Sequence, residues 1–342
     1  LAQVFMTTQL AGAATYFLPF NQGSNGAGEV GGKGNPPNPD NFMTAYLWEN
    51  VLRKDRLMEI LQKYIHLDVK KDGRKSIIFP RYHQLDVVTK LLADVKANGT
   101  GKNYLIQHSA GSGKSNSIAW LAHRLSGRHD ANDKKIFISV IVVTDRKVLD
   151  SQLQDTVYQF DHVRGVVKKV EKNSKELLQA INDRIPIIIT TLQKFPVIFE
   201  QIKAGGRRFA IICDEAHSSQ TGEAAKKLKY ALADMEKELE EAAKIANQDE
   251  NAKPDYQDKI VQELASHGTH KNMSFFAFTA TPKGKTLQMF GTKMPDGTYR
   301  AFHIYSMRQA IEEGFILDVL KNYTTYKTYY KIAKSEENDP EF

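Results

Sequence analysis

Short apolar runs alternate with segments of helical periodicity through the middle of the chain. The runs are rich in β-branched and aromatic residues and predict strands at 102–107, 136–144, 186–191, 209–213 and 274–278. Strands that are separated by helical segments are typical of a parallel sheet with right-handed crossover connections. The pattern therefore predicts an α/β fold in which helices cover one parallel sheet.

The regions that flank this pattern differ from it. Residues 1–20 hold short apolar stretches that predict a hairpin, and residues 21–41 are dominated by Gly, Asn and Pro, which predict a long loop. Apolar residues at helical spacing in 44–65 predict one or two helices, and we expect a boundary in the charged stretch 68–75. From 222 to 272 the composition shifts to Ala, Glu and Lys, which predicts a long amphipathic helix followed by a polar stretch.

Composition bounds the class of protein. The chain has 342 residues, of which 41% are hydrophobic, so it can bury a sizeable core, and its length predicts two or three units. Trp48 and Trp120 lie within helical periods, and we expect both in the core. The net charge of +7 arises from 47 basic and 40 acidic residues that are spread along the chain, so it favours an anionic partner only weakly.

The single cysteine, Cys213, lies inside an apolar run. It excludes a disulfide within the chain and argues against a cysteine-rich zinc site, so we expect a reducing, cytoplasmic environment. No apolar run approaches the roughly 18 to 20 residues of a membrane span, and the N-terminus lacks the pattern of a signal peptide. The chain begins without Met in a strand-like stretch, so we expect it to be part of a longer polypeptide.

A phosphate-binding loop is predicted after the first strand of the sheet, at Gly111-Ser112-Gly113-Lys114-Ser115. Small residues let backbone N–H groups approach phosphate oxygens, and the helix that follows adds its N-terminal dipole. We expect Lys114 to neutralise the β- and γ-phosphates of ATP and Ser115 to bind Mg²⁺. A chance turn is the alternative, because His108 stands where such loops usually have their first glycine.

A pair of carboxylates follows the strand at 209–213, in the sequence Asp214-Glu215-Ala216-His217. An Asp at the end of a buried strand can hold Mg²⁺ through water while the adjacent Glu polarises the attacking water. We therefore assign Asp214 to the metal, and Glu215 and His217 together with Lys114 and Asp214 to catalysis. A solvated acidic turn is the alternative interpretation.

Two further segments fit the same site. Thr279 and Thr281 follow the last strand, where their hydroxyls could bond Glu215 or His217 and relay the nucleotide state to a DNA site. Gln84, in Arg81-Tyr82-His83-Gln84, offers the donor and acceptor that the edge of adenine requires, and Arg81 or Tyr82 could stack on the base. A polar cluster that caps a helix is the alternative for this segment.

Polar residues after two other strands predict contacts with DNA phosphates. Thr144 and Arg146 follow one strand, and Thr191 and Lys194 follow another. Hydroxyl and basic groups suit phosphate contacts that do not discriminate between bases. Each segment could equally be the N-cap of the next helix.

The motifs occur in the order found in superfamily 2 helicase motors, which the chain resembles. Gln84 and residues 111–115, 214–217 and 279–281 match the Q, I, II and III motifs of these motors. Longer segments resemble the R (HsdR) subunit of type I restriction-modification enzymes, for which His108 is a normal residue; these segments are 107–115, 142–150, 214–220 and 276–283.

This resemblance implies a RecA-like P-loop parallel sheet with flanking helices, preceded by a small remnant of an α/β nuclease domain. It places the nuclease remnant and a linker in 1–72, the first motor domain in 73–320, and the start of a connection to a second, absent motor lobe in 321–342. It also implies ATP and Mg²⁺ as cofactors and translocation of double-stranded DNA with cleavage at a remote position. Its implied partners are the methylase and specificity subunits in the cytoplasm of a bacterium or archaeon.

Two departures limit what the resemblance implies. No Glu-x-Lys precedes the motor segment, and we interpret Asp68-Val69-Lys70 as a chance match, so we expect the cleavage centre to be missing. A second lobe would supply arginines that contribute roughly 10³- to 10⁵-fold to the rate, so we expect this chain to bind ATP but to hydrolyse it poorly. The alternatives are another superfamily 2 DNA helicase or translocase, and a non-catalytic fragment that docks on other subunits or on DNA.

Overall fold

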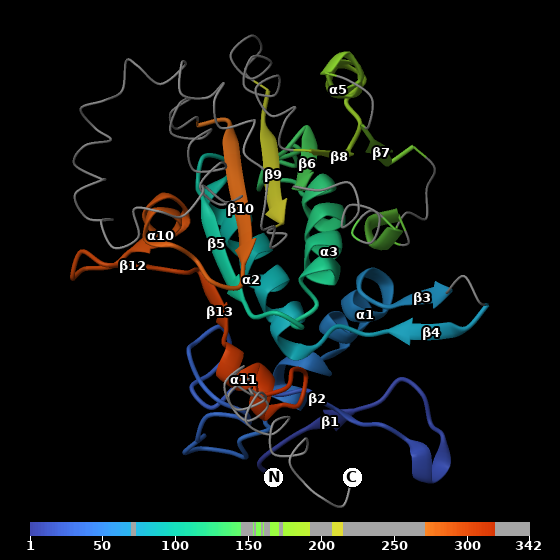
Figure 1. The fold of residues 1–342 in the computed structure, drawn as a ribbon, viewed down its shortest axis with the longest axis vertical. Coiled ribbons are helices and arrows are strands. Elements are labelled where there is room, and N and C mark those ends of the chain that lie inside the picture. The colour runs from blue at the N-terminus through green and yellow to red at the C-terminus, as the bar shows by residue number, and fades with distance from the viewer. Residues whose placement is uncertain are drawn as a thin grey trace, which may run out of the picture.

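The computed structural model describes residues 1–69, 73–144, 153, 155–158, 160, 165–170, 174–191, 207–214 and 271–318. Its centre is a seven-stranded sheet in which every neighbouring pair of strands is parallel (Figure 1). Its strands, in spatial order, are β13 (His303–Tyr305), β5 (Tyr104–His108), β10 (Met273–Thr279), β9 (Phe209–Asp214), β6 (Ser139–Thr144), β8 (Ile187–Thr191) and β7 (Val167–Lys169). The predicted α/β fold class is therefore confirmed.

The strands predicted from apolar runs correspond to β5, β6, β8, β9 and β10, with bounds that differ by at most three residues from the prediction. Both β7 and β13 are only three residues long, and the sequence pattern did not predict them. A run of that length has too few positions to establish a period of two. They form the two edges of the sheet.

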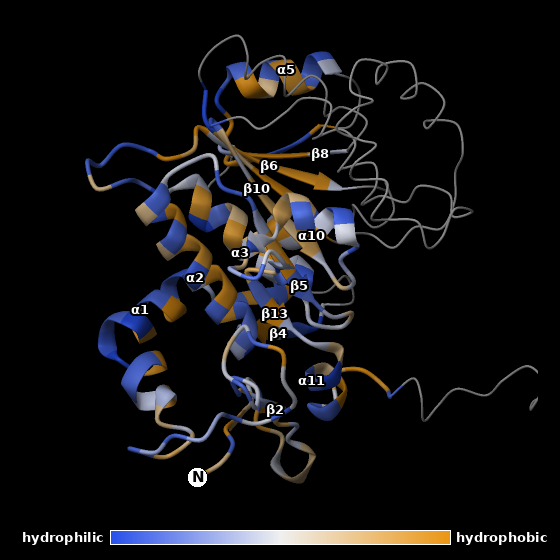
Figure 2. Cartoon of the chain, turned by 90° about the vertical axis from the view of Figure 1, so that its left-hand side faces the viewer, coloured by the Kyte–Doolittle hydropathy of each residue, from blue (hydrophilic) through white to orange (hydrophobic). Residues whose placement is uncertain are grey.

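Helices cover both faces of the sheet. On one face lie α2 (Tyr82–Asn98) and α3 (Lys114–Ser126), and on the other lie α5 (Ser174–Asn182) and α10 (Gly284–Phe290). Successive side chains of a strand point to opposite faces, so Tyr104 and Ile106 pack in the first core while Leu105 packs in the second. Figure 2 shows the apolar strands enclosed between helices whose outer faces are polar. This explains why the strands are continuous apolar runs.

The N-terminal flank has the elements that its pattern predicts. The strands β1 (Phe5–Met6) and β2 (Leu18–Pro19) pair antiparallel, with the short 3₁₀ helix η1 (Gly12–Ala14) between them. A turn of π-helix, η2 (Leu47–Val51), precedes α1 (Lys54–Lys63).

The prediction that both tryptophans lie in the core is half wrong. Trp120 on α3 is fully buried, whereas 42% of Trp48 is exposed. Trp120 lies on the face of α3 that packs in the core against the sheet, and its indole N–H donates to Tyr64 O at 2.9 Å. Trp48 lies in the irregular turn η2, where helical spacing does not decide which face is buried.

A second hairpin spans the stretch in which we expected a boundary. It consists of β3 (His66–Val69) and β4 (Lys75–Ile78), whose register pairs Asp68 with Ser76. The ends of the charged stretch 68–75 therefore belong to two paired strands. The domain boundary that we expected there stays a prediction. Residue Lys70 of the Asp68-Val69-Lys70 match lies outside the described residues.

The C-terminal part of the described chain folds back onto the N-terminal loop. After the hairpin of β11 (Thr292–Lys293) and β12 (Tyr299–Arg300) come β13 and α11 (Met307–Glu312). Hydrogen bonds join the N-terminal loop to this region. Ile304 N donates to Gly28 O at 2.9 Å, and Ser306 Oγ donates to Gly31 O at 2.7 Å. In the other direction, Lys33 N donates to Glu312 Oε2 at 2.8 Å. Figure 1 shows this loop beside α11.

The helix predicted between 222 and 272 lies outside the described residues except at its last two positions. In the described part of the chain, no helix is both long enough and apolar enough to cross a membrane.

Candidate nucleotide-binding site

The nucleotide loop, residues 108–115, connects the carboxyl end of β5 to the start of α3. Gly111 and Gly113 have φ of +71° and +76°, a region that L side chains rarely adopt. A Cβ on Gly111 would lie 2.5 Å from Ile316 Cγ2, and one on Gly113 would lie 2.5 Å from Gln84 Nε2. Both positions therefore require glycine for conformation and for space.

Lys114, the first residue of α3, directs its ammonium group back over the loop. Its Nζ lies 3.3 Å from His108 O and 3.4 Å from Ser109 O. Ser115 follows it in the first turn of the helix. The cation, the helix N-terminus and the adjacent hydroxyl thus lie together, which suits a magnesium-bound polyphosphate.

The start of α2 holds the loop from the opposite side. Arg81 Nη1 donates to Gly111 O at 2.9 Å, His83 Nε2 to Ser112 O at 2.9 Å, and Gln84 Nε2 to Gly113 O at 2.9 Å and to Ser112 O at 3.2 Å. A trans peptide points its N–H opposite to its C=O. Because these carbonyls face α2, the N–H groups of Gly113 and Lys114 face away from it, on the side where a phosphate would bind.

The side chain of Gln84, which we expected to contact adenine, is bonded to the nucleotide loop and to Arg81. Only 2% of Gln84 is exposed, and its Nε2 donates to the loop while its Oε1 accepts from Arg81 N at 2.8 Å. The predicted contact of Gln84 with adenine stays a prediction. In this arrangement the amide braces the phosphate loop.

Arg81 also closes the outer side of the loop. Its guanidinium lies 3.7 Å from the centroid of the Phe315 ring, in the segment that follows α11. Burial lowers the pKa of Arg81, an effect that Tyr305 and Glu313 oppose. An arginine stays protonated in proteins, so this cation adds to the positive potential at the loop.

Asp214 lies on the same edge of the sheet as the loop, at the end of β9. The strand β10 separates β9 from β5, and its register pairs Phe278 with Asp214 on one side and Thr279 with Gln107 on the other. Neighbouring strands lie about 4.8 Å apart, so the two ends are separated by roughly 10 Å across β10. This is the carboxyl edge at which α/β sheets bind ligands.

The threonines of the coupling motif lie between the two halves of the site. Thr279 ends β10 and is buried, and its hydroxyl accepts from Thr281 N at 3.3 Å. Glu215 and His217, to which we expected these hydroxyls to bond, lie outside the described residues. The coupling role therefore stays a prediction.

The residues predicted to contact DNA are only partly described. Thr144 and Thr191 pair with each other at the ends of β6 and β8, whereas Arg146 and Lys194 lie outside the described residues. Thr144 is buried, and its hydroxyl has no hydrogen-bond partner among the described residues. DNA contact at these strand ends stays a prediction.

Sequence reasoning missed a histidine cluster beneath the loop, formed by His83, His108 and His303. His108 Nε2 lies 2.9 Å from His303 Nδ1, the His83 ring lies edge-on to His108 at 5.4 Å, and none of the three is more than 6% exposed. His108 stood out in the sequence because it replaces the usual first glycine of the loop, but His303 lies on the unpredicted strand β13. The two histidines come together because β13 pairs with β5 in the folded chain.

The SWI2/SNF2 ATPase family model matches residues 83–342 of the chain. The chain belongs to the SWI2/SNF2 ATPase family. This match covers α2 from its second residue, the nucleotide loop and the strands that carry Asp214 and Thr279. ATP-dependent hydrolysis is the activity of the family, and the placement of the loop and Asp214 at one sheet edge agrees with nucleotide use.

Curated relatives confirm the resemblance to restriction enzyme subunits. The chain is 26% identical over 300 residues to the type I restriction enzyme SauCOLORF180P endonuclease subunit of Staphylococcus aureus (strain COL), covering 85% of this chain and 26% of that protein. It is 26% identical over 236 residues to the putative type I restriction enzyme MjaVIIIP endonuclease subunit of Methanocaldococcus jannaschii, covering 58% of this chain and 23% of that protein. The chain thus spans about a quarter of the length of these relatives.

Among solved structures, the chain is similar to a nuclease-deletion mutant of the Type ISP restriction-modification enzyme LlaGI in complex with a DNA substrate mimic. The identity is 19%, the TM-score is 0.40, and the similarity covers 75% of this chain and 23% of that one.

Proposed function

We propose that the chain is the first motor lobe of an R subunit of a type I restriction enzyme, and that it binds ATP with Mg²⁺ at the nucleotide loop. In the assembled enzyme this lobe couples ATP hydrolysis to translocation of double-stranded DNA, and cleavage follows at a remote position. The proposal rests on one observation: the loop and Asp214 lie at the same carboxyl edge of the sheet, on opposite sides of β10.

The residues of the site fit this substrate. Glycines at positions 111 and 113 let the loop pass close to Ile316 and Gln84, where a Cβ would have no space, and Lys114 lies over the loop carbonyls. We assign Ser115 and Asp214 to the metal, which would neutralise charge on the β- and γ-phosphates when bound. Lys114 stabilises negative charge on the phosphates, and Glu215 with His217 orients the attacking water.

The DNA partner and the other subunits are part of the same proposal. The type I restriction enzyme relatives support DNA as the track. We extend the proposal to methylase and specificity subunits as the anchor. Because a second lobe supplies arginines worth roughly 10³- to 10⁵-fold in rate, we expect weak ATP turnover by these residues alone.

ATP binding tests the proposal directly. Isothermal titration of the chain with Mg-ATP should give a measurable Kd, and Lys114→Ala should weaken it by about a hundredfold or more. Lys102→Ala is the matched control, because Lys102 pairs with Asp94 at the opposite end of β5. Equal affinity of wild type and Lys114→Ala would contradict the proposed site.

Two further measurements separate the alternatives. Strand displacement by the chain extended through a second lobe would favour a helicase over a translocase that leaves the duplex intact. Unchanged activity of a complex that carries Lys114→Ala would favour a non-catalytic docking fragment. Strong DNA-stimulated hydrolysis by these 342 residues alone would contradict the expectation of weak turnover.

A further inference from the structure

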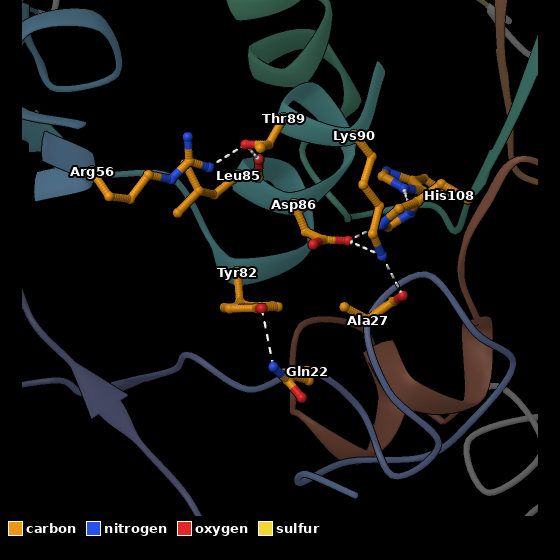
Figure 3. Close-up of polar contacts among 10 residues, drawn as sticks. Gln22, Ala27, Arg56, Tyr82, Leu85, Asp86, Thr89, Lys90 and His108 are labelled. Carbon is orange, nitrogen blue, oxygen red and sulfur yellow. Dashed lines mark hydrogen bonds and ion pairs between the residues drawn. The ribbon is translucent and has the colours of Figure 1, made fainter. Parts of the chain in front are cut away.

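A continuous chain of polar groups runs beneath the nucleotide loop from the partly buried Asp86 of α2 to the buried end of β5. Asp86 Oδ2 lies 3.0 Å from His303 Nε2, and His303 Nδ1 lies 2.9 Å from His108 Nε2. Neither histidine is accessible to solvent, and His108 is the first residue of the loop. Figure 3 shows Asp86 and Lys90 of α2 beside His108.

The chemistry of these groups fixes the direction of each hydrogen bond. A carboxylate can only accept, so His303 donates from Nε2 to Asp86. Burial lowers the pKa of His303 and of His108, so both rings are neutral, and His303 Nδ1 must accept the proton that His108 Nε2 donates. The chain is therefore directed from the imidazole of His108 to the carboxylate of Asp86.

His83 provides a second, parallel attachment. It donates from Nε2 to Ser112 O, and its ring stacks on Tyr305 with centroids 3.7 Å apart. Tyr305 O in turn accepts from Ser109 N at 3.0 Å. The start and the middle of the loop are thus both held by groups on α2 and β13.

We propose that His108, His303 and His83 are positioning residues for the nucleotide, which hold the loop in its phosphate-accepting shape before ATP arrives. A loop with two glycines has many accessible conformations when it is free, so ordering it carries an entropic cost. Anchors that order the loop in advance remove that cost from binding. This inference rests on the proposed ATP site.

The same chain contacts the N-terminal glycine-rich loop. A Cβ on Gly28 would lie 2.8 Å from His303 Cδ2, and Lys90 Nζ donates to Ala27 O at 2.7 Å while pairing with Asp86. His303 is fully buried and contacts Asp86 and His108, and Gly28 lies against its ring. We therefore expect a displacement of Gly28 to move His303 and, through His108, the nucleotide loop.

The first test compares substitutions of His108. His108→Leu removes the donor and should weaken Mg-ATP binding by about tenfold, whereas His108→Gln places an amide donor at similar reach and should stay within about threefold of wild type. His66→Leu is the matched control, because His66 is buried beside Trp120 and Phe160, away from the loop. It should lower the melting temperature without changing the Kd. Equal Kd values for His108→Leu and wild type, or an equal loss in His66→Leu, would overturn the proposal.

A second pair of variants leaves the nucleotide loop and the three histidines unchanged. Gly28→Ala and Gly26→Ala introduce the same side chain at φ of +83° and +99°, but only at Gly28 does the new Cβ meet another residue within 4 Å. We expect Gly28→Ala to weaken Mg-ATP binding severalfold more than Gly26→Ala. Identical affinities of these two variants would show that His303 does not transmit the displacement.

A readout without nucleotide separates this inference from the proposed function. Long-range ¹H–¹⁵N spectra of the chain should assign His108 and His303 as neutral rings protonated at Nε2. A ring protonated at Nδ1 or at both nitrogens would contradict the directed chain whether or not ATP binds. Absence of ATP binding by wild type, with the expected ring states observed, would instead count against the proposed ATP site.

Discussion

The two ends of helix α2 hold the sheet by different means. At its N-terminal end Arg81, His83 and Gln84 bind carbonyls of the nucleotide loop; the side chains of His83 and Gln84 are buried, whereas the contact of Arg81 is exposed. At its C-terminal end Asp94 accepts from Lys102 Nζ at 2.8 Å and from Tyr104 Oη at 2.7 Å, in a setting that is partly exposed. The contacts at the N-terminal end shape a binding site, whereas those at the C-terminal end only attach the helix to the sheet.

The electrostatic states of the two ends differ in the same way. At the N-terminal end burial lowers the pKa of His83 to about 3, so its ring is neutral and acts through directed hydrogen bonds. At the other end burial raises the pKa of Asp94, but its hydrogen bonds with Lys102 and Tyr104 outweigh this and lower the pKa overall. A charged, hydrated pair tolerates displacement, whereas a buried neutral network does not.

The largest expected difference between the ends comes from glycine substitutions. Gly113→Ala places a Cβ 2.5 Å from Gln84 Nε2 at φ of +76°, and Gly99→Ala, just after α2, meets nothing within 4 Å at φ of +69°. We expect Gly113→Ala to weaken Mg-ATP binding by about a hundredfold, since backbone strain of about 1–3 kcal/mol adds to displacement of the Gln84 brace. Gly99→Ala should lower stability by a similar strain but leave the Kd unchanged. Titration calorimetry and thermal unfolding of both variants would measure this, and equal losses of affinity would remove the distinction.

Acidification should act on the N-terminal end first. An unfolded histidine gains its proton near pH 6.5, whereas folded His83 stays neutral down to about pH 3. Stability is therefore complete above pH 6.5 and falls as the pH decreases, by about 2 kcal/mol for such a histidine between pH 6.5 and pH 5. Asp94 remains ionised over this interval, because its pKa is lowered from a value that is already acidic.

Urea unfolding at pH 7 and pH 5 measures this effect. His83→Gln should lose less stability than wild type on acidification, while Asp94→Asn should lose as much as wild type. A wild-type chain with equal stability at the two pH values would contradict the neutral, buried state of the histidines.

A smaller effect is expected from Tyr104→Phe at the C-terminal end. The substitution removes the hydrogen bond from Tyr104 Oη to Asp94 but keeps the ring, which stacks on Phe276 at 4.8 Å. We expect a loss of about 1 kcal/mol in the free energy of unfolding and no change in ATP affinity. A weaker ATP affinity in this variant would mean that both ends of α2 contribute to the site.

The smallest effect is expected from Lys102→Ala. The side chain of Lys102 is 40% exposed, and pairs of this kind contribute about 0–1 kcal/mol, less at high salt. Unfolding in low and high salt should show a small loss that disappears as the ionic strength rises. A loss that is independent of salt would indicate packing of the lysine stem instead.

Most of the sheet could be predicted because its strands are buried on both faces. The runs that became β6, β8, β9 and β10 are continuous and apolar, and such runs form strands wherever helices cover both sides. The loop glycines were also predicted, since only glycine suits a close approach of phosphate at positive φ. Both features can be seen in the local sequence, as a continuous apolar run in the first case and as two glycines before a lysine in the second.

The position of Trp48 and the strand β13 could not be predicted in this way. Trp48 has the same helical spacing as Trp120, but burial depends on which face meets the sheet, and that is set by packing of distant elements. β13 is too short to carry a period, and it forms because its residues pair with β5.

The sequence by itself determined the order of the motifs, the parallel sheet and the residues that a phosphate requires, because backbone conformation and hydrophobic period are local properties. Only the tertiary structure decided that Gln84 braces the loop and that His108 meets His303, which lies 195 residues further along the chain. A hydrogen bond between such distant residues depends on how strands and helices cross in space, and no spacing in the sequence records that crossing.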